Sequence, residues 1–118
     1  MLEHLKRILS NLIDWHKPQT VWDTTANLPT PGSDSSGQYT VDGQDEMTLL
    51  HKADQAGELW VYMSRLTGNA LKVDTIAYAA NEIISKVYSI TGELVMVDCV
   101  NGAVAQTSRE TLVLVRKT

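Results

Sequence analysis

Two stretches of this chain begin with Gly-Glu-Leu, run on through apolar residues and then meet an Asn beside a Gly. They are GELWVYMSRLTGNALKVD at residues 57–74 and GELVMVDCVNGAVAQTS at residues 92–108. In the first stretch, apolar residues alternate with bulky ones, as in a strand that is covered on both faces. In the second, Asn101-Gly102 is typical of a tight turn between paired strands. We therefore expect one β-hairpin used twice, and a last strand in TLVLVRKT at the C-terminus.

The segment between these stretches, TIAYAANEIISKVYSI, fits two structures. Its apolar residues at helical spacing are Ile76, Ala80, Ile83, Ile84 and Val87. A strand fits less well, because Ile83 and Ile84 are adjacent and Lys86 would share a face with Ile84. The β-branched residues after Glu82 favour a strand instead. The spacing favours a helix near 75–90, with a strand as the alternative.

The N-terminus carries a leucine stripe at spacings of three, four and three residues, formed by Leu2, Leu5, Leu9 and Leu12. Charged and polar residues take the other side, so the pattern predicts an amphipathic helix over residues 1–16. The stripe either packs on the protein's own sheet or forms an interface, since its spacing matches a coiled-coil seam. These four leucines are our candidate interface residues.

Residues 18–43 have no period and are rich in Pro, Gly, Ser and Asp. This composition predicts a long loop or an arm that reaches a neighbouring subunit. A chain of 118 residues fits a single domain. We expect residues 1–118 to form one α+β domain, in which a helix at 1–16 and the arm precede a β-rich core at 44–118 with mainly antiparallel strands.

The charge balance argues against nucleic acid as a partner, because the net charge is −4 and the sequence pI is about 5.2. No apolar run approaches the roughly 20 residues of a membrane-spanning helix, and the N-terminus does not read as a signal peptide. Cys99 stands alone, which excludes an internal disulfide and favours a reducing compartment. We expect a cytoplasmic or particle-associated protein.

Aromatic bulk must come from Trp and Tyr, because the chain has no Phe. Trp22, Trp60 and Tyr62 are candidates for lining a pocket for a sugar or an aromatic ligand. Packing in the core is the commoner use of such residues.

Signals for catalysis and metal binding are weak. His4, His16 and His51 show no metal-ligand spacing, and the acidic cluster of Asp34, Asp42, Asp45 and Glu46 lacks the spacing of a calcium loop. Glu58 and Glu93 occupy equivalent positions in the two hairpins, so adjacent hairpins would bring two carboxylates together for acid-base work. We expect no metal and no cofactor, and we regard an enzyme as the less favoured reading.

Three function classes remain. The leading hypothesis is a non-enzymatic assembly module that self-associates through the first helix, the arm or a sheet edge, by analogy an accessory protein of a phage or another mobile element. Its partners would be copies of itself or another protein. The alternatives are a small-ligand binding module with a Trp/Tyr-lined pocket and a small enzyme that uses strand-end carboxylates.

Overall fold

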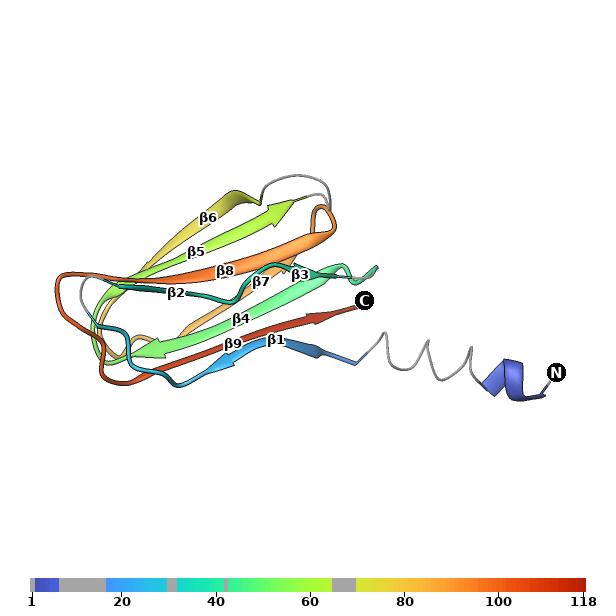
Figure 1. Cartoon of the computed structure of the whole chain (residues 1–118), viewed down its shortest axis with the longest axis horizontal. Helices are drawn as coiled ribbons and strands as arrows, with labels where there is room; N and C mark the ends of the chain where they lie inside the picture. Colours follow the sequence, from blue (N-terminus) through green and yellow to red (C-terminus); the bar gives the residue numbers. More distant parts are fainter. Residues whose placement is uncertain (1, 7–16, 30–31, 42, 65–69) are drawn as a thin grey trace.

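The protein is built from β-strands in two sheets (Figure 1). This computed structural model describes residues 2–6, 17–29, 32–41, 43–64 and 70–118. The strands of the described residues are β1 (Gln19–Thr24), β2 (Ser33–Ser35), β3 (Tyr39–Thr40), β4 (Glu46–Ala53), β5 (Gly57–Ser64), β6 (Leu71–Tyr78), β7 (Ile84–Ser89), β8 (Leu94–Asn101) and β9 (Arg109–Arg116).

The two sheets have the strand orders β1-β9-β4-β7 and β2-β8-β5-β6, and β3 also pairs with β8. All of these pairs are antiparallel. The chain passes from one sheet to the other after β1, β3, β4, β6, β7 and β8, so most sequence neighbours do not pair. This order, with β1 beside β9 and β4 beside β7, is that of a jelly roll.

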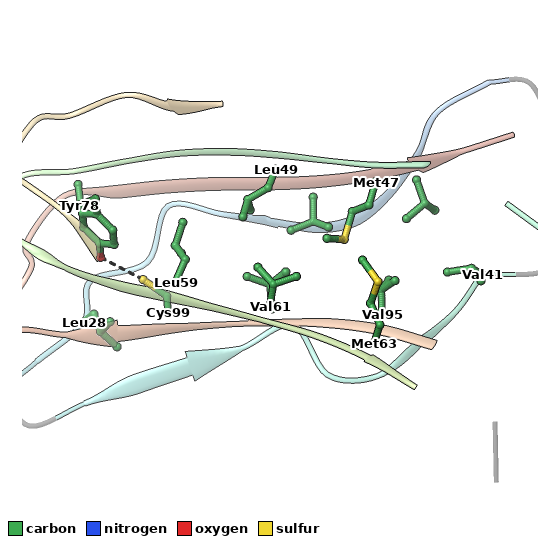
Figure 2. Packing of buried hydrophobic residues seen from close by; sticks show 14 residues of the cluster. Leu28, Val41, Met47, Leu49, Leu59, Val61, Met63, Tyr78, Val95 and Cys99 are labelled. Carbon is green, nitrogen blue, oxygen red and sulfur yellow. Dashed lines mark hydrogen bonds between the residues drawn. The ribbon is translucent and has the colours of Figure 1, made fainter. Parts of the chain in front are cut away.

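The core lies between the two sheets, and strict alternation along the strands creates it. In β5, Leu59, Val61 and Met63 point inward and are buried, while the residues between them face outward. Val113 and Val115 of β9 are buried from the opposite sheet. Figure 2 shows the side chains of both sheets meeting along one continuous row.

The expected helix near 75–90 is wrong. Strand β6 continues to Tyr78, a turn follows in which Asn81 has a φ of 62°, and β7 begins at Ile84. In this strand Lys86 shares a face with Ile84. The charge of Lys86 is accommodated because β7 is an edge strand, and Lys86 Nζ lies 2.9 Å from Asp74 Oδ2 at the margin of the sandwich.

Only the first of the two expected hairpins exists, in which β5 pairs with β6. Strand β8 pairs with β5, β2 and β3, while β9 pairs with β1 and β4 in the other sheet. Neither Asn101 nor Gly102 has the positive φ that a type I′ turn requires. Instead, Asn101 Nδ2 donates to the carbonyl of Leu28 at 2.6 Å, and the Gly102 amide donates to Ala56 at 3.2 Å.

Residues 18–43 do not form a free arm in the described part of the chain. They supply β1, β2 and β3 to the sandwich, and the strand pairing of Leu28 with Gln106 fixes the segment between β1 and β2. These strands are short, lie at or near sheet edges and are largely exposed, so their sequence carries little apolar pattern.

The α+β assignment is also wrong, because the described residues are nearly all β. The only helical residues among them are Leu2 to Lys6, and residues 7–16 of the expected first helix lie outside the described residues. Leu2 and Leu5 are exposed, so the sandwich does not cover them.

Candidate functional site

Edge strands β6 and β7 lie on the same side of the sandwich, one in each sheet (Figure 1). This side, which we call the open side, exposes four large apolar side chains. They are Leu71 (68% exposed), Val73 (50%), Ile83 (74%) and Val87 (59%). The four residues are spread along this side, because Leu71 pairs with Met63 at one end and Ile83 precedes Ile84, which pairs with His51 at the other end.

A polar tie holds the two edge strands of the open side together. Asp74 of β6 accepts a hydrogen bond from Tyr88 Oη at 2.7 Å and one from Lys86 Nζ at 2.9 Å, and both donors lie on β7. The hydrogen bond from Tyr88 is the main cause that lowers the pKa of Asp74. Burial, followed by the Asp74 carboxylate, raises the pKa of Tyr88. These two hydrogen bonds link the edge strands of the two sheets.

The two edge strands differ in regularity. Val61 pairs with Asp74 and Tyr62 with Lys72, so Val73 is an extra residue in β6 that forms a bulge. A bulge is a common device that prevents another strand from adding to an edge. Strand β7 pairs with β4 without a register shift, and its outer edge has no strand partner among the described residues. The edge that can accept another strand is therefore β7.

A cavity of about 400 Å³ lies on the outer face of the β1-β9-β4-β7 sheet and adjoins the open side through Ile83. Leu50 of β4 and Leu112 of β9 pair directly and form its apolar floor. The charged residues that line it are Asp23, Lys52 and Glu110, and the remaining lining residues are Thr25, His51 and Thr111.

Polar groups are concentrated at one end of the core. Arg109 of β9 is 1% exposed, and its Nη2 donates to Asp34 Oδ2 of β2 at 2.7 Å, which links the two sheets. Its guanidinium carbon lies 5.6 Å from the centre of the Trp22 ring. Arg109 Nε and Nη1 have no hydrogen-bond partner among the described residues.

The other members of this polar group bond to one another. His51 Nδ1 lies 2.8 Å from Thr111 Oγ1, and burial, aided by the charge of Arg109, lowers the pKa of His51 to about 4. Tyr78 Oη accepts a hydrogen bond from Gln106 Nε2 and lies 3.4 Å from Cys99 Sγ. All of these side chains are almost fully buried, and of them His51 and Thr111 also contribute to the lining of the cavity.

The three predicted ligand-binding residues do not form one pocket. Trp22 packs against the core from β1, whereas Trp60 and Tyr62 lie on the outer face of β5 in the other sheet. Lys72 Nζ lies 4.4 Å from the centre of the Trp60 ring. Burial, followed by the nearby charge of Asp98, raises the pKa of Tyr62. The cavity lies elsewhere and contains none of the three predicted residues.

The two candidate catalytic carboxylates are far apart. Glu58 pairs with Val100 at one end of the β5–β8 pair, while the Glu93 amide donates to Ser64 at the other end. Six residues of strand separate these positions, which corresponds to about 20 Å. The antiparallel pairing of β5 and β8 therefore excludes joint acid-base action.

The remaining predicted site residues are not brought together either. His4 lies in the helical turn, His51 lies in the core, and His16 is outside the described residues. The acidic residues accept hydrogen bonds from separate partners: Asp34 from Arg109, Asp45 from Thr118 and Glu46 from Arg116. Asp42 is outside the described residues. Within the described ranges, no group of three or more His, Cys, Asp or Glu residues is placed to hold a metal ion.

Of the predicted interface leucines, Leu2 and Leu5 are 65% and 53% exposed, while Leu9 and Leu12 lie outside the described residues. The residue pattern does not predict the open side. Val73 and Val87 are visible in the sequence as apolar residues. That their strands lie at sheet edges depends on the strand order, which the sequence does not show.

A family model described as the N-terminal domain of the uncharacterised protein YqxG matches residues 7–115. The chain belongs to this family. None of the curated protein sequences that were searched matches it. No helix in the described part of this family member is both long and apolar enough to cross a bilayer.

Three solved structures share the fold of this family member. The PBSX exported protein XepA has a TM-score of 0.76 and 16% identity, over 86% of this chain and 37% of that chain. A chain from Bacillus endospore appendages, described as disulfide-linked pili, has a TM-score of 0.58 and 16% identity, over 86% and 87% of the two chains. The SPBc2 prophage-derived protein YomS has a TM-score of 0.54 and 12% identity, over 84% and 94%. The YqxG-type domain thus spans little more than a third of XepA, and at these identities the likeness shows the fold alone.

Proposed function

We propose that this protein is a non-enzymatic assembly module that self-associates through the open side, as an accessory protein of a phage or a related mobile element. The observation that carries the proposal is the pair of edge strands β6 and β7, with Leu71, Val73 and Val87 exposed on them and Ile83 exposed just before β7. The occupant of this surface is a second copy of the chain, because the regular edge of β7 can pair with the same edge of another copy.

Side-chain burial alone would give weak association. Fully burying one aliphatic side chain contributes about 1.5–3 kcal/mol, whereas association costs about 4–15 kcal/mol in lost freedom of movement. The four exposed residues therefore do little more than offset this cost. Backbone pairing along β7, or several contacts per copy, must supply the rest of the affinity.

The polar residues support a non-enzymatic role. The side chains that could take part in a reaction are buried between the sheets; they are His51, Cys99 and Arg109. His51 also contributes to the lining of the cavity, but its ring bonds Thr111 within the core. The accessible surface therefore offers contact area rather than a constellation of reactive groups.

The fold relatives agree with an assembly role, since one of them forms pili and another is prophage-derived. In one respect this chain must differ from the disulfide-linked pili. Cys99 is its only cysteine and has no exposed surface, so an assembly of the folded chain is non-covalent.

The test is the solution mass by light scattering on a sizing column over a range of concentrations. We expect a species heavier than the 13.0 kDa chain that dissociates on dilution. Val87→Lys should shift the protein toward the monomer, because a charge on β7 opposes edge pairing. Thr20→Lys adds the same charge to the exposed face of β1 and should leave the mass unchanged. A wild-type protein that stays at 13.0 kDa at all concentrations would contradict the proposal.

A further inference from the structure

The cavity on the β1-β9-β4-β7 sheet combines an apolar floor with an acidic margin. Leu50 and Leu112 form the floor, while Asp23 of β1 and Glu110 of β9 provide two carboxylates against the single ammonium group of Lys52. Neither Asp23 nor Glu110 forms an ion pair with another described residue. The cavity therefore suits an apolar group that carries a positive charge beside it.

The N-terminal segment of the chain has this chemistry. Leu2 and Leu5 are exposed, and Lys6 and Arg7 follow Leu5 directly in the sequence. In the described residues, the contact of Lys6 is a 3.7 Å pair with Glu3 in which both side chains are largely exposed, and such a pair contributes little energy. Leucines and a lysine are thus available to another surface.

The start of β1 and the cavity lie toward opposite ends of the same sheet. Strand β1 begins at Gln19, which pairs with Val115 near the end of β9. The cavity lies where β1 ends and β9 begins, at Asp23, Thr25 and Glu110. About five residues of strand, or roughly 17 Å, separate these points. Copies placed end to end would bring the start of β1 in one copy close to the cavity of the next.

We propose that the cavity binds the N-terminal segment of a second copy, with Leu2 and Leu5 over the apolar floor and Lys6 facing Asp23 and Glu110. This inference rests on the proposed function and adds a second, head-to-tail contact to it. Because the two surfaces are different, the contact is heterologous, and repeated copies form a ring or an open filament.

The test is a mixing experiment in a Val87→Lys background, in which the open side is blocked. Leu5→Asp removes the binding segment and leaves the cavity intact, while Glu110→Lys blocks the cavity and leaves the segment intact. Each variant alone should be monomeric. An equimolar mixture should give a one-to-one dimer and nothing larger, since the cavity of one variant accepts the segment of the other. Leu50→Asp provides a second way to block the cavity.

Val104→Asp is the matched control, because Val104 is 55% exposed and lies in neither surface. A mixture that remains monomeric at high concentration would overturn the inference. So would a Leu5→Asp variant that lowers the melting temperature without changing the mass, since the segment would then bind its own cavity. With Val87 intact, an oligomer whose mass is unchanged by Leu5→Asp would contradict this contact and leave the proposed open-side contact unaffected.

Discussion

At one end of the core the hydrogen bond from Arg109 of β9 to Asp34 of β2 joins the two sheets. At the other end the sheets are joined by aliphatic packing (Figure 2). The polar end contains His51, Tyr78, Cys99, Gln106, Arg109 and Thr111. The apolar end contains Val41, Met47, Met63, Val95 and Val115. The same strands supply both ends. Strand β4 of one sheet and strands β6 and β8 of the other all run from the apolar end to the polar end.

The difference teaches how the structure is specified. Aliphatic packing tolerates a change of shape if the volume is kept, whereas a buried polar group needs its particular partner. We therefore expect the polar end to fix how the two sheets are placed and the apolar end to contribute stability in a less specific way. Four predictions test this contrast, and each is an unfolding measurement.

The largest effect is expected for Gly57→Ala at the polar end. An added Cβ would lie 2.6 Å from Tyr78 Oη, 2.6 Å from the Val100 carbonyl and 2.7 Å from Gln106 Nε2. One of these atoms is backbone, so the clash cannot be relieved by a rotamer change alone. We expect a loss of about 3 kcal/mol or more in chemical denaturation. Gly43→Ala, at a positive φ with open space around it, should lose only about 1 kcal/mol.

Asp34→Asn should cost about 2–3 kcal/mol in the free energy of unfolding. It leaves the guanidinium of Arg109 buried without its countercharge, and the loss is moderated because the Asp34 side chain is 39% exposed. The double variant Asp34→Asn with Arg109→Met should lie closer to the wild type, because no unpaired charge remains. If the double variant is as unstable as the sum of the two single variants, the ion pair does not act as a unit.

His51 should make stability depend on pH. Its pKa is lowered from 6.5 to about 4 in the folded protein, so the unfolded chain binds the proton more readily. The stabilisation is fully present above pH 6.5 and falls as the pH drops toward 4. We expect a loss of about 2 kcal/mol between pH 7 and pH 4.5. His51→Gln should flatten this part of the profile, and an unchanged slope would show that the imidazole does not stay neutral in the fold.

The smallest effect is expected at the apolar end. Met47→Leu keeps the volume of a fully buried side chain, so thermal denaturation should show a loss below about 1.5 kcal/mol. Gln106→Leu is the comparable change at the polar end and should cost more, because Tyr78 Oη loses its donor. Equal losses for the two variants would remove the contrast between the ends.

Part of the fold followed from the sequence. Alternation in ELWVYMS predicts a central strand, and β5 lies between β8 and β6 in its sheet. The expected cover on both faces is wrong, because Trp60 and Tyr62 face outward and are only partly buried. The candidate site was not predictable in the same way. Leu71 and Val87 lie on the same side of the sandwich only because β6 and β7 are edge strands, and the order of strands depends on pairings between residues far apart in the chain.

The repeated Gly-Glu-Leu shows where local pattern stops being informative. Gly57 is required by the close approach of Tyr78, Val100 and Gln106, whereas Gly92 is required by a φ of 100°. The same letters therefore serve two physical needs, and the second stretch does not form the hairpin that the first one does.

The sequence by itself determined the strand-forming alternation, the absence of an internal disulfide and the acidic charge, because each depends on composition or on near neighbours in the chain. The tertiary structure alone decided whether residues 75–90 form a helix or strands, and which faces stay exposed. Residues 84–89 become a strand because β4 offers a complete antiparallel edge and Asp74 accepts the Lys86 ammonium group. Those partners lie 12 or more residues away along the chain, beyond the reach of any local periodicity.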